Sequence, residues 1–172
     1  MASVLAVAVF LTCGCGKKSE DATPVPETKG DQTMTTAVDE AKCAELKKSL
    51  SSQPEPLLVP PSKFFEGNDD MGSIGCNLIE HSGVGAFREV LVKLEARPDV
   101  ESVFLRISEL DPGEGCWPFS DSVWLAGTIS TEELKEILAP LKPDEVGQGK
   151  SFDQAPAFPA EHKGAVLFAW WD

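Results

Sequence analysis

Hydrophobic and polar positions follow two clear periods along the second half of the chain. Alternation with a period of two predicts strands at 72–80, 101–110, 122–129 and 165–171. Apolar residues that recur with a period of 3.6 predict helices at 84–97 and 130–141. Pro98 closes the first helix, and a capping box from Ser130 to Glu133 opens the second.

The predicted order is strand, helix, strand, strand, helix, strand, which is the order of the ferredoxin-like split βαβ motif. We therefore expect an α+β sandwich of the ferredoxin-like βαββαβ type over residues 72–172, with strand order 4-1-3-2. A Gly- and Pro-rich loop at 142–164 would lead into the last strand. No motif in this region assigns it to a sequence family.

An N-terminal helix and a Pro-rich extension are expected ahead of this domain, over residues 37–71. Thr36 and Asp39 have the spacing of a capping box, and an apolar stripe follows at Cys43, Leu46 and Leu50. The prolines that end this helix and keep the next stretch extended or irregular are Pro54, Pro56, Pro60 and Pro61.

The first fifteen residues indicate where the protein is located. The apolar run at 2–11 is too short to span a bilayer as a helix but has the length of a signal-peptide core. The Gly14-Cys15 pair that follows resembles a bacterial lipobox, which implies that Cys15 is lipidated; Cys13, after Thr12, is a poorer match. No Lys or Arg precedes the apolar run, which an upstream start codon would explain. The alternative is a cytoplasmic protein with an unprocessed apolar N-terminus.

Residues 16–36 are polar, with little to bury, which predicts a flexible tether between anchor and body. The tether holds three lysines and four acidic residues, a net −1, whereas the whole chain of 172 residues has a net charge of −13. The acidity therefore belongs to the body. This excludes nucleic acid as a partner, because binding to phosphates requires clustered Lys and Arg.

Loops at one edge of the expected sheet would gather both histidines with several acidic side chains and a thiol. Imidazole, carboxylate and thiolate groups are the ligands of divalent transition metals. The candidate metal ligands are His81, His162, Glu80, Asp111, Glu114 and Cys116. The competing interpretation is a set of solvated loop residues, because neither histidine has a second ligand at a recognised metal spacing.

No catalytic motif is present. We therefore expect no catalytic residues and no cofactor. Removal of Cys13 and lipidation of Cys15 would leave an odd set of thiols at Cys43, Cys76 and Cys116. A bridge from Cys43 to either of the other two, a bridge between Cys76 and Cys116, and three free thiols all remain open.

The second face of the sheet is predicted to be aromatic. Its candidate residues are Phe104, Trp124, Trp170 and Trp171. The N-terminal helix and the segment 54–65 would cover this face, or else it is an exposed patch that binds a partner. The sequence thus predicts a lipid-anchored envelope protein whose body binds or scaffolds an envelope protein or a small ligand. The alternative is a metal-binding or metal-dependent domain.

Overall fold

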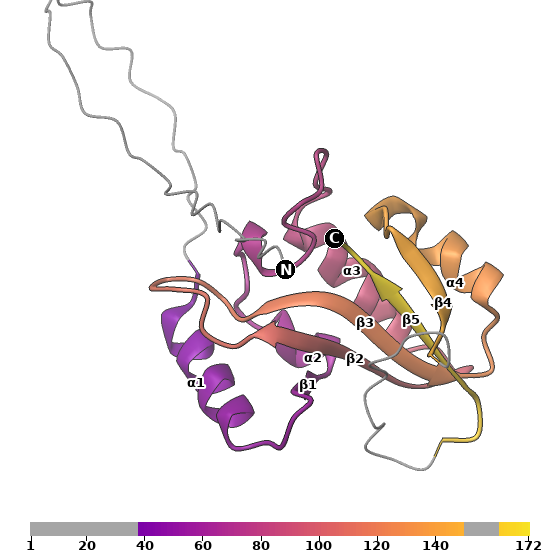
Figure 1. Cartoon of the computed structure of the whole chain (residues 1–172), viewed down its shortest axis with the longest axis horizontal. Coiled ribbons are helices and arrows are strands. Elements are labelled where there is room, and N and C mark those ends of the chain that lie inside the picture. Colours follow the sequence, from indigo (N-terminus) through magenta and orange to yellow (C-terminus); the bar gives the residue numbers. More distant parts are fainter. Residues whose placement is uncertain (1–37, 150–161) are drawn as a thin grey trace, which may run out of the picture. The chain divides into compact units, whose positions relative to one another are not determined.

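The computed structural model describes residues 38–149 and 162–172. Within them, five strands form one antiparallel sheet in the order β1-β2-β3-β5-β4 (Figure 1). The strands are β1 (Leu58–Val59), β2 (Val100–Glu109), β3 (Phe119–Gly127), β4 (Glu145–Gln148) and β5 (Ala165–Trp170). The long β2–β3 hairpin is the centre of the sheet, and a very short strand lies at each edge.

Helices pack against this sheet. They are α1 (Glu40–Ser51), α2 (Pro61–Phe64), α3 (Val84–Glu95) and α4 (Thr131–Leu138), with 3₁₀ turns η1 (Met71–Ser73) and η2 (Ala139–Leu141). In Figure 1, α1 and α4 lie at opposite ends of the hairpin. The predicted α+β class and the predicted N-terminal helix are confirmed.

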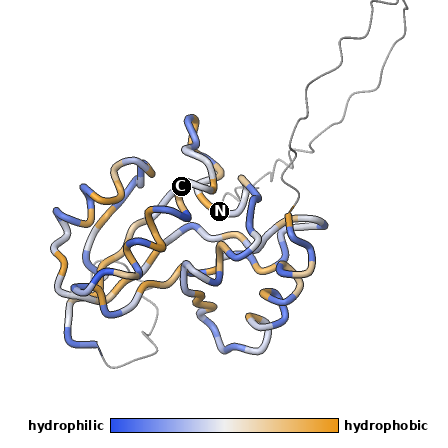
Figure 2. The backbone as a smooth tube through the Cα atoms, turned by 180° about the vertical axis from the view of Figure 1, so that it is seen from behind, coloured by the Kyte–Doolittle hydropathy of each residue, from blue (hydrophilic) through white to orange (hydrophobic). Residues whose placement is uncertain are grey.

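A single hydrophobic core joins these elements. One face of the sheet supplies the alternate residues Val103, Leu105 and Ile107 of β2, with Val123 and Leu125 of β3. The same cluster contains buried residues from the region that was expected to lie outside the main domain: Cys43, Leu50, Leu57, Val59, Phe64 and Phe65. Figure 2 shows hydrophobic stretches along the strands and alternating hydropathy along the helices, as amphipathic helices require. The N-terminal helix and the Pro-rich extension therefore contribute buried side chains to this core.

The predicted strand at 72–80 is wrong. A 3₁₀ turn occupies Met71–Ser73, and only Ile74 forms an isolated bridge, to Ser120. Gly75 has φ +61°, a left-handed conformation that a strand does not use, and the chain turns there. After Gly75 the alternating apolar residues are not buried as those of a strand would be; Ile79, for example, is fully exposed.

The ferredoxin-like arrangement is consequently not confirmed. It requires a first strand in the sheet between two others, whereas β3 pairs directly with β5 here. Three short elements that the pattern did not indicate are also present, namely β1, α2 and β4. β4 lies inside the stretch expected to be an irregular loop and pairs with β5.

Helix capping explains where two helices begin. Ser130 Oγ accepts a hydrogen bond from the Glu133 backbone N–H at 3.1 Å, which confirms the predicted cap of α4. For α1 the cap is Asp39, whose carboxylate accepts from the Lys42 N–H at 3.1 Å. The expected box placed the cap at Thr36, three residues too early.

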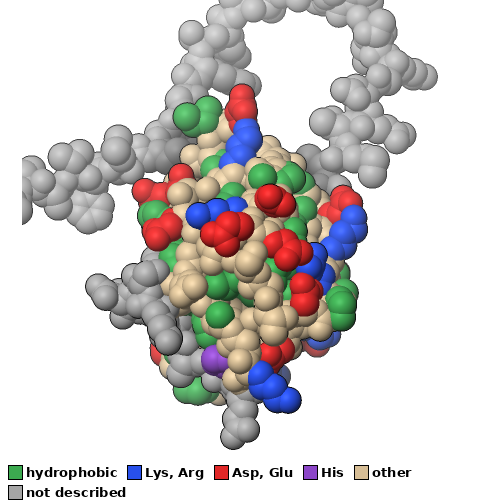
Figure 3. Space-filling view, turned by 90° about the vertical axis from the view of Figure 1, so that its right-hand side faces the viewer, with side chains coloured by type: hydrophobic (Ala, Val, Ile, Leu, Met, Phe, Trp, Pro, Cys, Tyr) green, Lys and Arg blue, Asp and Glu red, His purple; other side chains and the backbone are tan. Residues whose placement is uncertain are grey.

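The surface of the body mixes acidic, basic and apolar side chains, as the face in Figure 3 shows. Among the residues that the structure describes, no helix is long and apolar enough to cross a membrane.

Candidate binding groove and the predicted site residues

A groove of about 210 Å³ lies between α1 and the β1–α2 segment. Its apolar lining comes from both sides, from Leu46 and Leu50 on α1 and from Leu58 and Val59 on β1. The remaining lining residues are Lys42, Glu45, Ser49, Gln53, Pro60, Lys63 and Glu66. This cleft, which we call the α1–β1 groove, combines an apolar floor with a polar rim, the usual make-up of a binding site.

The outer edge of β1 faces this groove. The Ile107 N–H donates to the Leu57 carbonyl at 2.9 Å, and Leu58 lies opposite Arg106 in the register of β1 and β2. Residues of an antiparallel edge strand alternate between bonding to the neighbouring strand and pointing away from it. Because Leu57 bonds to β2, the N–H and C=O of Leu58 point away from β2. Leu58 also lines the groove, so we infer that these two groups face it.

Paired charges form the rim. Glu66 accepts hydrogen bonds from Lys42 Nζ at 2.7 Å and from Lys63 Nζ at 3.1 Å. Hydrogen bonds from Lys42 and Lys63 lower the pKa of Glu66, and the same carboxylate raises the pKa of Lys42. With Glu45 close to Lys42 at 3.5 Å, two lysines and two glutamates balance one another. The rim is thus neutral, although the chain carries −13.

His81 is held by the backbone on both sides of its ring. Its Nδ1 accepts from the Gly83 N–H at 2.8 Å, and its Nε2 lies 2.8 Å from the Ile74 carbonyl oxygen. Because Nδ1 is an acceptor here, Nε2 carries the proton and donates to Ile74. The ring also stacks on Phe87, with centroids 5.3 Å apart. Neither nitrogen is left to bind a metal in this arrangement.

The two histidines lie at opposite ends of the sheet. His81 contacts Ile74, which bridges to Ser120 near the start of β3. His162 contacts the Gly164 carbonyl, directly before β5 begins opposite Gly127 at the end of β3. Ser120 and Gly127 are about 23 Å apart at the usual rise of a strand.

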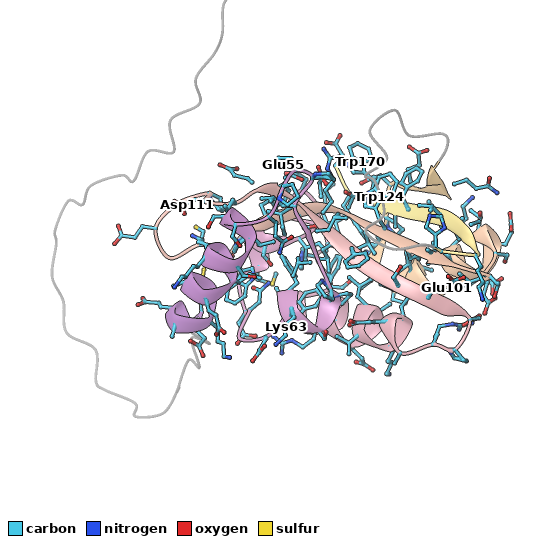
Figure 4. The ribbon with its side chains drawn as sticks, turned by 90° about the horizontal axis from the view of Figure 1, so that it is seen from below. Glu55, Lys63, Glu101, Asp111, Trp124 and Trp170 are labelled. Atoms are coloured by element: carbon cyan, nitrogen blue, oxygen red, sulfur yellow. The ribbon has the colours of Figure 1, made fainter. Side chains whose placement is uncertain are left out.

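The other candidate metal ligands are also dispersed. Glu80 pairs with Lys142 at 2.6 Å, which lowers the pKa of Glu80, and Asp111 pairs with Lys47 of α1 at 2.7 Å. Figure 4 shows Asp111 at one end of the body and Glu101, which contacts the chain beside His162, at the other. Glu114 and Cys116 share the β2–β3 turn with Asp111. Over 38–149 and 162–172, no three His, Cys, Asp or Glu side chains are grouped as metal ligands would be.

The aromatic residues do not share one face. Phe104, Trp124 and Phe168 lie side by side across β2, β3 and β5, on the face turned away from the helices. Trp124 and Phe168 stack with centroids 5.3 Å apart and are both fully buried. Trp170 lies beside this row and is half-buried. Trp171, in contrast, belongs to the helix-covered core, where its indole N–H donates to the Leu141 carbonyl.

Three cysteines are described, and all are free thiols. Cys43 is buried on α1, and its Sγ donates to the Cys116 carbonyl oxygen at 3.4 Å. Cys116 is half-buried in the β2–β3 turn. Cys76 is exposed, and its thiol contacts the side chain of Asn77. The predicted lipidation residue Cys15 lies outside the described residues.

Sequence reasoning missed the α1–β1 groove. The only signal for it is a short apolar run, Leu57 to Val59, placed between prolines. Such a run is typical of a protected edge strand, since proline follows where no further ladder bond forms. Two residues are too few for a period to be recognised.

The fold and the groove define an α+β protein with one antiparallel sheet and a helix-walled cleft at its edge. The chain belongs to the YfbO family, whose description is "Uncharacterized protein YfbO family" and whose model matches residues 41–167. A relative, Uncharacterized protein YfbO of Escherichia coli (strain K12), is 32% identical over 121 residues, which cover 69% of this chain and 84% of the relative. No solved structure gives a significant match.

The family match corrects one expectation. The sequence motifs assigned no family to the globular part, whereas the match spans nearly all of it, from α1 into β5. It begins after the lipobox-like segment, so it concerns the body and not the proposed anchor.

Proposed function

We propose that this protein is a bacterial envelope lipoprotein, anchored by lipid on Cys15, whose body binds an extended segment of a partner protein in the α1–β1 groove. The role is binding or scaffolding, without catalysis. The polar tether at 16–36 gives the body reach from the membrane. Lipid chains on a single cysteine supply the membrane affinity, since each buried methylene contributes about 0.8 kcal/mol.

The binding part of the proposal is based on the outward N–H and C=O groups of Leu58, which can pair with another strand. A partner segment in extended conformation supplies the complementary C=O and N–H groups, as in other cases of strand addition to a sheet edge. α1 forms the opposite wall and confines the segment to the groove.

The lining of the groove defines the chemistry of the segment. Leu46 of α1, which is half-buried, offers an apolar surface for one side chain of the segment. The neutral rim neither attracts nor repels a charged peptide by its net charge. The partner segment is therefore short, extended and apolar at the position that faces α1, and its net charge does not decide binding.

Site-specific photocrosslinking in the bacterial envelope tests the binding part. A benzophenone side chain replaces Gln53, which lines the groove, and in a matched control replaces Glu136, an exposed residue on the far helix α4. We expect crosslinks to a defined protein from position 53 and not from position 136. Adding Leu58→Pro removes the outward N–H but no ladder bond, so it should reduce the crosslink at least several-fold with the fold retained.

Equal crosslinking from both positions, or crosslinking indifferent to Leu58→Pro in a folded variant, contradicts the groove as the binding site. Circular dichroism of the purified variant shows whether it is folded. Absence of any crosslink from several groove positions contradicts the binding function itself.

Metabolic labelling with palmitate tests the anchor. The parent chain and Cys13→Ser should incorporate the label, whereas Cys15→Ser should not. If Cys15→Ser still incorporates palmitate, the lipidated residue is not Cys15. If the parent chain incorporates none, the cytoplasmic alternative is favoured.

A further inference from the structure

We infer that Cys43 and Cys116 form an intramolecular disulfide when the protein meets a disulfide oxidant, so that α1 becomes linked covalently to the β2–β3 turn. This modification site is independent of the proposed binding function. It rests on the placement of the two thiols and of the groups around them.

The two cysteines are neighbours across the join between α1 and the turn. The Cys43 sulfur lies 3.4 Å from the Cys116 carbonyl oxygen. A carbonyl oxygen is about 2.4 Å from its own Cα by standard backbone dimensions. The Cys43 sulfur is therefore within about 6 Å of the Cys116 Cα, which makes the two cysteines spatial neighbours.

A second contact holds the same two elements together. Lys47, one helical turn after Cys43 and on the same face of α1, pairs with Asp111 of the turn at 2.7 Å. The ion pair and the thiol contact thus connect one face of α1 to one turn. This limits how far the two sulfurs can separate.

The turn has the freedom to close the remaining distance. Gly113 and Gly115 precede Cys116 with φ of +150° and +74°. A Cβ added at Gly115 would meet nothing within 4 Å, so the backbone has open space there. The Cys116 thiol donates to the Glu114 carbonyl oxygen at 3.8 Å, and glycines at these positions permit the rotation that brings its sulfur onto that of Cys43.

An oxidant can reach the pair through a cleft of about 260 Å³. Its lining includes both cysteines, together with Val38, Glu40, Ala44, Glu114 and Gly115. Cys116 is the more accessible thiol, whereas burial raises the pKa of the Cys43 thiol. The first exchange therefore occurs at Cys116.

The reaction is balanced by a low-molecular-weight disulfide such as glutathione disulfide. The Cys116 thiolate attacks one sulfur of the oxidant, which gives a mixed disulfide and releases one thiol. The Cys43 thiolate then attacks the Cys116 sulfur, breaks the mixed disulfide and releases the second thiol. Two cysteine thiols lose two protons and two electrons, and one glutathione disulfide becomes two glutathione molecules.

Peptide mapping of the full chain after incubation with glutathione disulfide tests the inference. Trypsin cleavage at Lys and Arg places Cys43, Cys116 and Cys76 on separate peptides, 43–47, 107–135 and 64–88. We expect a linked 43–47/107–135 pair that disappears on reduction and in Cys116→Ser. Cys76→Ser is the matched control and should leave the pair unchanged. Asp111→Asn should slow its formation several-fold, because it weakens the contact with Lys47.

Two outcomes overturn the inference. In one, Cys43 stays fully alkylatable while Cys116 retains glutathione. In the other, Cys116 links to Cys76 instead. The thermal unfolding midpoint of the oxidised chain separates a native link from a link in misfolded protein, since only the native link raises it.

Discussion

Glu101 shows how one carboxylate can fix the start of a strand. Its two oxygens accept hydrogen bonds from the backbone N–H groups of Lys163 and Gly164, both at 2.9 Å, directly before β5. These bonds lower the pKa of Glu101 below its ordinary value of 4.5. The ionised side chain therefore connects the start of β2 to the residues just before β5.

This pKa shift predicts a pH dependence of stability. A carboxyl group whose pKa is lower in the folded state stabilises the fold fully above its unfolded pKa, here 4.5, and loses that contribution as the pH falls through the folded value. We expect Glu101→Gln to lower the thermal unfolding midpoint at pH 7 and to lower it less at pH 3. A difference that stays constant between the two pH values would contradict the assignment to ionised Glu101.

The bonds of His81 predict a structural role for this residue. In His81→Leu the Gly83 N–H loses its acceptor and the Ile74 carbonyl its donor, which should cost about 1–3 kcal/mol of unfolding free energy. Chemical denaturation of both proteins measures the difference. Glu80→Gln, at an exposed neighbour, is the control and should leave the stability nearly unchanged, because exposed ion pairs contribute little. If His81→Leu is as stable as the parent, His81 does not have this structural role.

At the level of elements, the start of α4 is fixed by Ser130 and by a link to α3. Arg97, just beyond α3, forms ion pairs with Asp99 and with Glu133 in the first turn of α4. Hydrogen bonds from Arg97 lower the pKa of Asp99, and both carboxylates raise the pKa of Arg97. The cap and the ion pair position the same helical turn.

Ser130→Ala should therefore destabilise the protein by about 0.5–2 kcal/mol, because the Glu133 N–H loses its acceptor. Urea unfolding followed by circular dichroism measures this loss. Ser130→Asp retains a capping oxygen and should restore most of it. Equal destabilisation by Ala and Asp would mean that the cap does not fix this helix.

The same elements show what the sequence could predict. α3, β2, β3, α4 and β5 are long, with several buried positions each, so their periods were visible in the sequence. The two-residue β1 and the four-residue β4 are too short to show a period, and they exist because β2 and β5 are there to pair with. The opposite error occurred at 72–80, where the alternating pattern predicted a strand but no neighbouring strand pairs with this stretch beyond the single bridge at Ile74.

The predicted metal site depended on the predicted strand order, so the wrong strand at 72–80 made the predicted site wrong as well. The strand order 4-1-3-2 placed His81 and His162 at one edge of the sheet. Without the first strand they lie at its two ends. Cys43 and Cys116 are 73 positions apart in the sequence, and only the packing of α1 on the β2–β3 turn brings them together.

For the whole molecule, the dispersed ligands predict that metal ions do not stabilise the fold. The thermal unfolding midpoint of the full chain should be the same after treatment with a chelator and after addition of zinc ions. A rise with zinc that the chelator reverses would support the metal-binding alternative. His81→Leu and a variant at His162 would then show which of the two histidines is involved.

The short edge strands have a consequence for aggregation. β3 pairs along both of its edges, with β2 and with β5, whereas β1 pairs with only Leu105 and Arg106 of β2. The sheet ends in two residues at β1 and in four at β4, which begins with Glu145. Edge strands this short are poor templates for extending a sheet from molecule to molecule, and the edge of β1 therefore has room to pair with only a short segment of another chain.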